Sequence, residues 1–294
     1  MSVKENKPGH ISYSGEEQSL GSVVASQSSA TISYMINDSG TWSTVAPTAK
    51  NVGEYKVSYK VELANYESIE GQFVTYIDKA TNSFTTLTCD DIKYQETPNP
   101  TIVVKFGSQS DIEIAYTNND TGEVSTEWNT ENLPGTYKLS AYMPSTDNYT
   151  YAYQTTEFKV NPLTMTVAQN PATGLVYDGE KHELGSVSPT GEKSETEGFT
   201  IYYKVGEGEY STDAPTATDA GTYTVGYKVE KRGYTTVEST FDTSIAKATN
   251  NAISNLACAD FPYGKGGTPE PTATATFGTI TYKYSTSQSG PFTD

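Results

Sequence analysis

Residues 214–250 read APTATDAGTYTVGYKVEKRGYTTVESTFDTSIAKATN, and this stretch decides the fold. Past Gly221, aromatic or aliphatic side chains occupy every second position, namely Tyr223, Val225, Tyr227 and Val229. Thr, Gly and Lys stand between them. A period of two is typical of a strand with one face on a core and the other in water. The stretch therefore predicts a half-buried strand.

The same stretch occurs a second time in the chain. Residues 46–82 read APTAKNVGEYKVSYKVELANYESIEGQFVTYIDKATN and match 214–250 without a gap at over half of their positions. Upstream, SYSGEEQSLGS at 12–22 matches VYDGEKHELGS at 176–186. We call this unit type A. Such internal repeats indicate tandem copies of one small fold.

A second unit, type B, follows each A copy. TCDDIKY at 88–94 matches ACADFPY at 257–263. The order A-B-A-B predicts four modules, which are 1–79 (A, with its N-terminal edge slightly trimmed), 80–161 (B), 162–247 (A) and 248–294 (B, truncated). The last module lacks counterparts of two strands, so we expect it to be disordered, distorted or paired with a neighbour.

Turns and linkers complete the expected architecture. NDSG at 37–40 and GEGE at 206–209 each follow a tyrosine-bearing strand, at the spacing of a β-sandwich. No stretch shows a sustained helical period. The expected fold is therefore all-β, as tandem immunoglobulin-like β-sandwich modules with almost no helix. The linkers 78–82, 160–163 and 246–250 are short and not rich in Gly and Ser, which predicts an elongated array.

The segment DAGTYTV at 219–225 looks like the tyrosine corner of immunoglobulin domains. In that corner, a Tyr near the start of strand F hydrogen-bonds back to the chain, two residues before a cysteine. Val225 stands at the cysteine position here. Tyr55 and Tyr137 keep the frame of Tyr223, although no acid precedes Tyr137. We expect all three to be structural, in modules that rely on burial and have no disulfide.

These motifs together resemble a known family. YDG at 177–179, the aromatic residue that follows a hairpin (Trp42, Tyr210), APTATDAGTY at 214–223 and IAKA at 245–248 are similar to bacterial immunoglobulin-like repeats of the MBG/YDG type. The resemblance implies rows of modules that hold a functional head away from the cell wall or that adhere. It implies no catalytic residue. It also implies an extracellular or cell-surface location in a bacterium, with the signal and the anchor outside these residues.

Composition limits the partners. The net charge is -17 with a pI of about 4.5, and 35% of the residues are hydrophobic. Nucleic acid and anionic membranes need a basic face, so neither is an expected partner. No apolar run is long enough to span a membrane, so we expect no membrane insertion. Neighbouring repeats of the same chain are the expected contacts.

Candidates for catalytic chemistry are few. The two histidines, His10 and His182, are not equivalent in the A repeats, and GKGG at 264–267 reads as a turn rather than a phosphate loop. We therefore expect neither an enzyme nor a bound cofactor. Cys89 and Cys258 occupy one place in the two B modules. This equivalence argues against a single intramolecular disulfide and favours a small buried apolar residue, with a thiol open to crosslinking as the alternative.

Two binding hypotheses remain open. NYTYAYQ at 148–154 places Tyr149, Tyr151 and Tyr153 on one predicted strand face, which is either a core ladder or a strip that stacks on sugars. The acidic loops NNDTG at 118–122 and STDNY at 145–149 offer oxygen ligands, so calcium is the one metal considered.

Two functions follow. The first is a stalk or spacer without a ligand. The second is an adhesive module that binds a glycan or a host surface protein.

Overall fold

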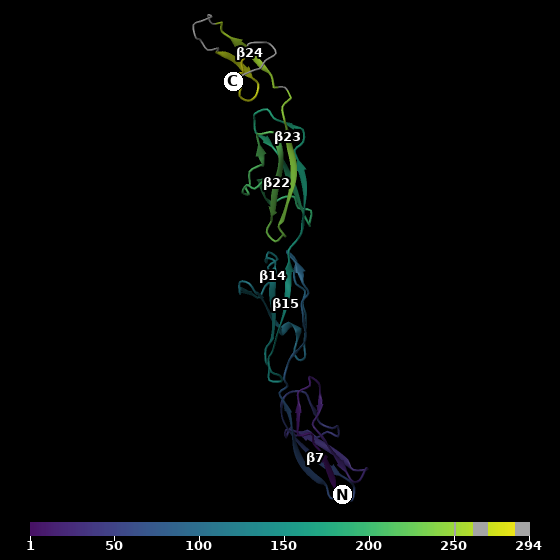
Figure 1. The fold of residues 1–294 in the computed structure, drawn as a ribbon. Coiled ribbons are helices and arrows are strands. Elements are labelled where there is room, and N and C mark those ends of the chain that lie inside the picture. The colour runs from purple at the N-terminus through teal and green to yellow at the C-terminus, as the bar shows by residue number, and fades with distance from the viewer. Residues whose placement is uncertain (250, 261–269, 286–294) are drawn as a thin grey trace. The chain divides into compact units, whose positions relative to one another are not determined.

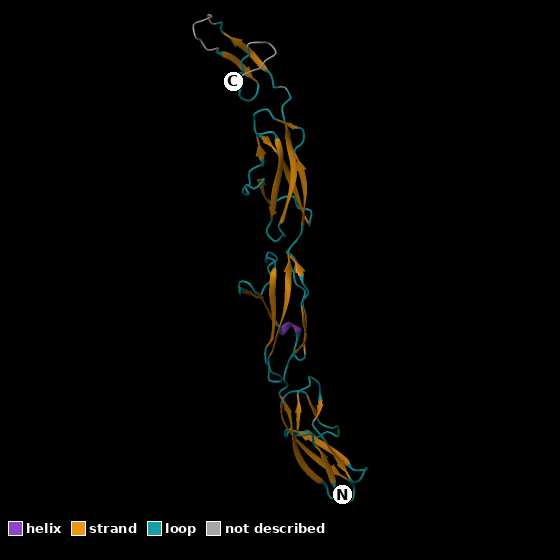
Figure 2. Ribbon diagram, viewed as in Figure 1, coloured by secondary structure: helices purple, strands orange, loops and turns teal. Residues whose placement is uncertain are grey.

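The computed structural model describes residues 1–249, 251–260 and 270–285. Strands dominate this part of the chain, and its one helical element is a short 3-10 turn, η1 (Gln109–Asp111), purple in Figure 2. The expected all-β class is confirmed. The chain forms two compact units, Met1–Asn161 and Pro162–Asp294. The turn expected at 264–267 lies outside the described residues.

The first A module contains a four-stranded sheet of order β2-β8-β7-β5. β2 runs parallel to β8, and the other neighbours are antiparallel. A second sheet pairs β1 with β4, and a short one pairs β3 with β6. The strands are β1 (Val3–Asn6), β2 (His10–Ser12), β3 (Gln18–Ser19), β4 (Ser22–Ala25), β5 (Thr31–Ile36), β6 (Thr48–Ala49), β7 (Gly53–Glu62) and β8 (Ile69–Asp78).

The second A module repeats this topology strand for strand. Its large sheet has the order β17-β23-β22-β20, its second sheet pairs β16 with β19, and β18 pairs with β21. The hairpin of β22 and β23 is labelled in Figure 1. The strands are β16 (Met165–Pro171), β17 (Leu175–Val176), β18 (His182–Glu183), β19 (Gly185–Gly191), β20 (Thr200–Val205), β21 (Thr216–Ala217), β22 (Gly221–Glu230) and β23 (Val237–Ala246).

The first B module is a variant of the same sandwich. Its large sheet has the order β10-β15-β14-β12-β13, with β10 parallel to β15, and β11 pairs with β9. The A and B sequences therefore specify one fold. The strands are β9 (Phe84–Thr88), β10 (Ile92–Lys93), β11 (Thr101–Val104), β12 (Glu113–Asn118), β13 (Val124–Ser125), β14 (Gly135–Met143) and β15 (Ala152–Asn161).

In the last module, the described residues contain two paired strands, β24 (Ile253–Cys258) and β25 (Pro271–Ala275). Every residue of β24 is exposed. Cys258 is therefore exposed, and Cys89 is half-buried just after β9, so neither is the fully buried residue that the sequence predicted. Among the described residues, the two strands of every pair belong to the same predicted module.

Each core is built by the alternation seen in the sequence. On β7 and β22 the predicted inward residues are buried or half-buried, and the polar residues between them are half-buried or exposed. The residues at the place of the second immunoglobulin cysteine are completely buried, with 0% exposure for Val57, Leu139 and Val225. Aliphatic packing therefore fills the position that a disulfide occupies in antibody domains.

A tyrosine phenol, buried in the first copy and half-buried in the second, also joins the two sheets of each A module. The N–H of Val23 on β4 donates to Oη of Tyr34 on β5 over 2.8 Å. The N–H of Val187 donates to Oη of Tyr203 over 2.9 Å in the second copy. A buried amide that lost this acceptor would be unsatisfied, so the tyrosine specifies the register of the sheets as well as filling space.

Candidate interaction surfaces

The three predicted corner tyrosines share one hydrogen bond. Each lies on the third residue of β7, β14 or β22, and its phenol donates to the carbonyl oxygen four residues earlier. The distances are 2.7 Å from Tyr55 to Asn51, 2.9 Å from Tyr137 to Leu133 and 2.6 Å from Tyr223 to Asp219. Because the acceptor is a main-chain carbonyl, the first B module needs no acid to form its corner.

Burial raises the pKa of two of these phenols. It raises the pKa of Tyr55, and the nearby Glu17 carboxylate raises that pKa further. Burial also raises the pKa of Tyr137, against a smaller lowering by a hydrogen bond from Asn118. A protonated phenol can donate to a carbonyl and a phenolate cannot, so the raised pKa extends the pH range of these two corner hydrogen bonds further into alkali.

The tyrosines of NYTYAYQ do not share one exposed face. Tyr149 is only 7% exposed, whereas Tyr151 is 61% and Tyr153 58% exposed. The chain bends at Asp147 and Asn148, Tyr149 forms an isolated bridge with Ala80, and β15 begins only at Ala152, so strict alternation does not extend back to Tyr149. The predicted strip is wrong in this respect. Its two exposed members remain candidates for glycan contact.

A third ring completes the exposed group. Tyr142 on β14 is paired across the sheet with Tyr153 on β15, and its ring stacks on that of Tyr151 with centroids 6.1 Å apart. Tyr142 is 37% exposed. We call Tyr142, Tyr151 and Tyr153 the exposed tyrosine group. Sequence alternation on β14 could have revealed Tyr142, because it stands between the inward Ala141 and Met143.

Tyr149 belongs to the joint between the first A and B modules. Its ring centroid lies 6.3 Å from that of Tyr13 and 6.0 Å from that of Phe106, and Tyr13 and Phe106 are 5.4 Å apart. Tyr177 and Phe277 repeat the Tyr13–Phe106 contact at 5.3 Å. The tyrosine of the YDG motif therefore lies at the joint between an A and a B module. The sequence could have indicated this, because the tyrosine recurs in both A modules and a Phe-Gly pair recurs in both B modules.

A neighbouring asparagine extends this joint. Oδ1 of Asn148 accepts a hydrogen bond from the N–H of Val52 over 2.8 Å, and Nδ2 of Asn148 donates to Oδ1 of Asn51 over 3.1 Å. Asn148 lies in STDNY, one of the two loops considered for calcium. In the other loop, Oδ1 of Asn118 accepts from the N–H groups of Asp120 and Thr121. Both side-chain oxygens are thus already engaged by N–H donors.

The aromatic residue after the hairpin packs on the outer face of the sheet. Tyr210 lies near Lys204 on β20, whose Nζ is 4.9 Å from the ring centroid, and donates to Glu238 on β23 over 2.6 Å. Burial first, then this hydrogen bond and the charge of Glu238, raise the pKa of Tyr210 to about 12. Trp42 lies beside the corresponding strands of the first A module.

Sequence reasoning did not single out Trp128. Its ring packs within 5.1–5.5 Å of the rings of Tyr116, Tyr137 and Phe158, and its Nε1 donates to the carbonyl of Glu96 over 2.9 Å. This cluster covers one end of the core of the first B module. The tryptophan has no counterpart at the matching hairpin position of the A modules, which is why repeat comparison passed over it.

The remaining titratable candidates are dispersed over the surface. His10 pairs with Asp78 at 2.9 Å, and His182 pairs with Asp178 at 2.9 Å. Burial raises the pKa of the Cys89 thiol, and the carboxylates of Asp90 and Asp91 raise it further. Within residues 1–249, 251–260 and 270–285, no three His, Cys, Asp or Glu side chains are grouped to hold a metal ion.

The described part of the chain also contains no helix with the length and apolar character needed to cross a membrane.

No family model matches this sequence, and no curated protein matches it. Solved structures give distant likenesses. Immunoglobulin domains 1–5 of Sidekick-1 are 15% identical with a TM-score of 0.25, over 84% of this chain and 60% of that one. Drosophila N-cadherin EC1-3 is 8% identical with a TM-score of 0.25, over 83% and 99%. A bacterial ice-binding adhesin is 12% identical with a TM-score of 0.26, over 84% and 98%.

This chain therefore spans about 60% of the Sidekick-1 structure's length. With such TM-scores, none of these proteins indicates what this chain binds. Its immunoglobulin-like architecture follows from its own strand order, corner hydrogen bonds and cores.

Proposed function

We propose that this chain is a non-catalytic spacer or adhesive repeat region of a bacterial surface protein, located outside the cell. The observation that supports this most is that structural contacts, rather than a reactive centre, are copied from module to module. The corner hydrogen bond occurs in three modules, and the Tyr–Val bond between sheets occurs in both A modules. Copying a module adds length, stiffness or another weak contact.

The titratable side chains support a non-catalytic role. His10 lies on β2 beside a strand partner, whereas His182 lies on β18 and pairs within its own loop, so the two histidines serve different local contacts. The raised pKa of Cys89 leaves less thiolate, which is the reactive form of cysteine.

Force spectroscopy tests the spacer role. The full chain, held at its two ends and stretched, should unfold in separate steps, because the first three modules each have their own buried core. A module of about 80 residues should release roughly 270 Å of extended chain per step. One cooperative step for the whole chain would contradict independent modules. Small-angle scattering from a compact globule would contradict the elongated array expected from the linkers.

A second candidate function is glycan binding by the exposed tyrosine group. Tyrosine combines a flat apolar ring with a polar tip, and clustered exposed rings mark interaction surfaces on soluble proteins. Tyr151 and Tyr153 expose more than half of their surface, and Tyr142 supplies a stacked neighbour. Tyr142 and Tyr153 lie on the adjacent strands β14 and β15, and Tyr151 directly precedes β15, so binding would cost little conformational entropy. A host surface protein is the other partner that such rings could contact.

Affinity electrophoresis of the full chain in gels containing plant or mucin glycans tests this candidate. Retardation by one glycan should be lost in Tyr151→Ala and Tyr153→Ala. Tyr66→Ala is the matched control, because Tyr66 is 50% exposed on a different module. Retardation that is unchanged in both variants of the group would eliminate it as a glycan site.

A further inference from the structure

Two module joints share one backbone contact between a linker residue and the end of a hairpin. Ala80 forms a parallel bridge with Tyr149, and Leu163 forms one with Tyr234. The N–H of Ala80 donates to the carbonyl of Asn148, and the N–H of Thr150 donates to the carbonyl of Ala80. These two hydrogen bonds attach the incoming linker to the far hairpin of the module that it enters.

The second copy uses the same atoms. The N–H of Leu163 donates to the carbonyl of Gly233, and the N–H of Thr235 donates to the carbonyl of Leu163, both over 2.9 Å. Leu163 is 1% exposed, so its side chain is buried. Tyr234 in turn donates to Glu195. Each linker bridge therefore needs a free carbonyl and a free N–H that flank a tyrosine at the hairpin end.

The first A module has the same hairpin end. The N–H of Tyr66 donates to the carbonyl of Leu63 over 3.1 Å, as that of Tyr234 does to Lys231 over 3.0 Å. Asn65 has a φ of 66°, and Gly233, at the matching position, has a φ of 78°. The backbone on either side of Tyr66 therefore already has the conformation that a linker bridge uses.

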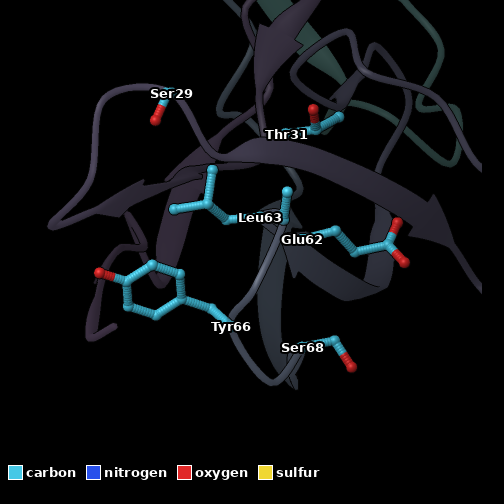
Figure 3. A pocket seen from close by; sticks show the side chains of 7 residues that line it. Ser29, Thr31, Glu62, Leu63, Tyr66 and Ser68 are labelled. Carbon is cyan, nitrogen blue, oxygen red and sulfur yellow. The ribbon is translucent and has the colours of Figure 1, made fainter.

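Within the described residues, this third hairpin has no bridging segment. The carbonyl of Asn65 and the N–H of Glu67 make no hydrogen bond there, and Tyr66 is 50% exposed. An open hollow of about 590 Å³ lies beside them, lined by Leu63, Tyr66, Ser29 and Thr31 among others. Figure 3 shows Leu63 and Tyr66 extending to the same side of the hairpin and Glu62 to the other.

We propose that this hairpin edge is a docking site for an extended segment of the Asn161–Thr164 type, with an aliphatic residue at the bridging position. The N–H of that residue would donate to Asn65, and its carbonyl would accept from Glu67. Its side chain would cover Leu63 and Tyr66. The carboxylates of Glu62 and Glu67 disfavour an acidic segment.

The direction of approach fits such a segment. Leu163 leads into Met165, which packs against the core of the second A module, and Met1 packs against the core of the first. A segment entering through Met1 would therefore reach Tyr66 as Leu163 reaches Tyr234. The occupant differs from a glycan or a host protein, so this site does not depend on the exposed tyrosine group.

Amide hydrogen exchange of the full chain tests the docking site. One form carries Asn-Pro-Leu-Thr directly ahead of Met1, and a matched control carries Asn-Pro-Asp-Thr. The leucine form should slow exchange of the Glu67 amide about ten-fold, as expected for one added hydrogen bond. The Asp control should leave it fast. Thr150 and Thr235 are internal standards, because their amides already make this bond and should be protected in every form.

A second variant tests whether the effect of the leucine extension depends on the hairpin edge at Tyr66. Glu67→Pro removes the donor, so the leucine and aspartate extensions should then become equivalent in melting temperature. The proposal is overturned if Glu67 exchanges equally fast with either extension, or if both extensions protect it equally. Rapid exchange at Thr235 in the unextended chain would also overturn it, because the bridge itself would then be absent.

Discussion

Nδ2 of Asn148 lies 3.1 Å from Oδ1 of Asn51, although the two residues are 97 positions apart and belong to different modules. The Asn51 carbonyl also accepts the corner hydrogen bond of Tyr55. One asparagine thus connects the corner of the first A module to the hairpin end of the first B module. The corner motif, which the sequence identified as a feature of single domains, also supports the joint between them.

Asn148→Ala should destabilise this joint more than Asn51→Ala. The first change removes the acceptor of the Val52 N–H as well as the contact to Asn51, and the second removes only that contact. We expect a coupling energy of about 0.5 kcal/mol between the two positions, because the contact is exposed to water. Calorimetry of the two single variants and the double variant measures it. Equal costs for the single variants would contradict this arrangement.

Tyr223→Phe should remove the corner hydrogen bond to Asp219 and leave the ring in place. The expected cost is about 1 kcal/mol, or about 4–8 °C in the melting temperature of the module. Tyr151→Phe is the control, because Tyr151 is exposed and makes no hydrogen bond in the described part of the chain. A melting temperature that is the same for both variants would show that the corner contributes nothing.

Tyr210 should ionise late in an alkaline titration. Its pKa is raised to about 12, above the usual value of about 10, first by burial and then by Glu238. A raised folded-state pKa stabilises the fold below pH 10, and that contribution is lost as the pH rises through 12. The difference in phenolate absorbance between the wild type and Tyr210→Phe isolates this residue. A midpoint near 10 would contradict the contact with Glu238.

Leu163→Ala should loosen the second linker bridge. Leu163 is 1% exposed, and removing a buried leucine side chain costs about 2–5 kcal/mol. Exchange of the Thr235 amide should accelerate, because its acceptor is the Leu163 carbonyl. Leu133→Ala, at a side chain that is 47% exposed, should change neither quantity and serves as the control. If Leu163→Ala leaves Thr235 protected, the side chain does not hold the bridge.

Calcium should not stabilise the chain. The side-chain oxygens of Asn118 and Asn148 already accept backbone N–H groups, so binding a cation there would first break those bonds. The melting temperature in millimolar calcium should equal that with a chelator at the same ionic strength. A rise with calcium that magnesium does not reproduce would reveal a site in these acidic modules.

Much of the fold was accessible from local pattern. The alternation in GTYTVGYKVE predicted which residues of β22 face the core, and Val225 and Val229 are indeed 0% exposed. The repeat predicted that the two A modules share one topology, and β7 and β22 occupy the same place in their sheets. These features depend on side chains a few residues apart, which a single sequence contains in full.

The candidate surfaces were accessible only in part. Tyr149, Tyr151 and Tyr153 alternate in the sequence, but Tyr149 lies before β15 and packs on Tyr13 of the preceding module. Tyr142 joins the exposed group because β14 is paired with β15 in one particular register. Neither fact is encoded in the local spacing.

The sequence by itself therefore determined the module order, the inward and outward faces of the long strands, and the positions of the corner tyrosines. Each of these follows from the two-residue period of a strand or from matching the repeats. Only the tertiary structure decided that Tyr149 is buried, that Asn148 reaches Asn51, and that no segment among the described residues bridges the hairpin end at Tyr66. These depend on strand register and on neighbouring modules, because burial and hydrogen bonding are set by whichever distant residues the fold brings within a few ångströms.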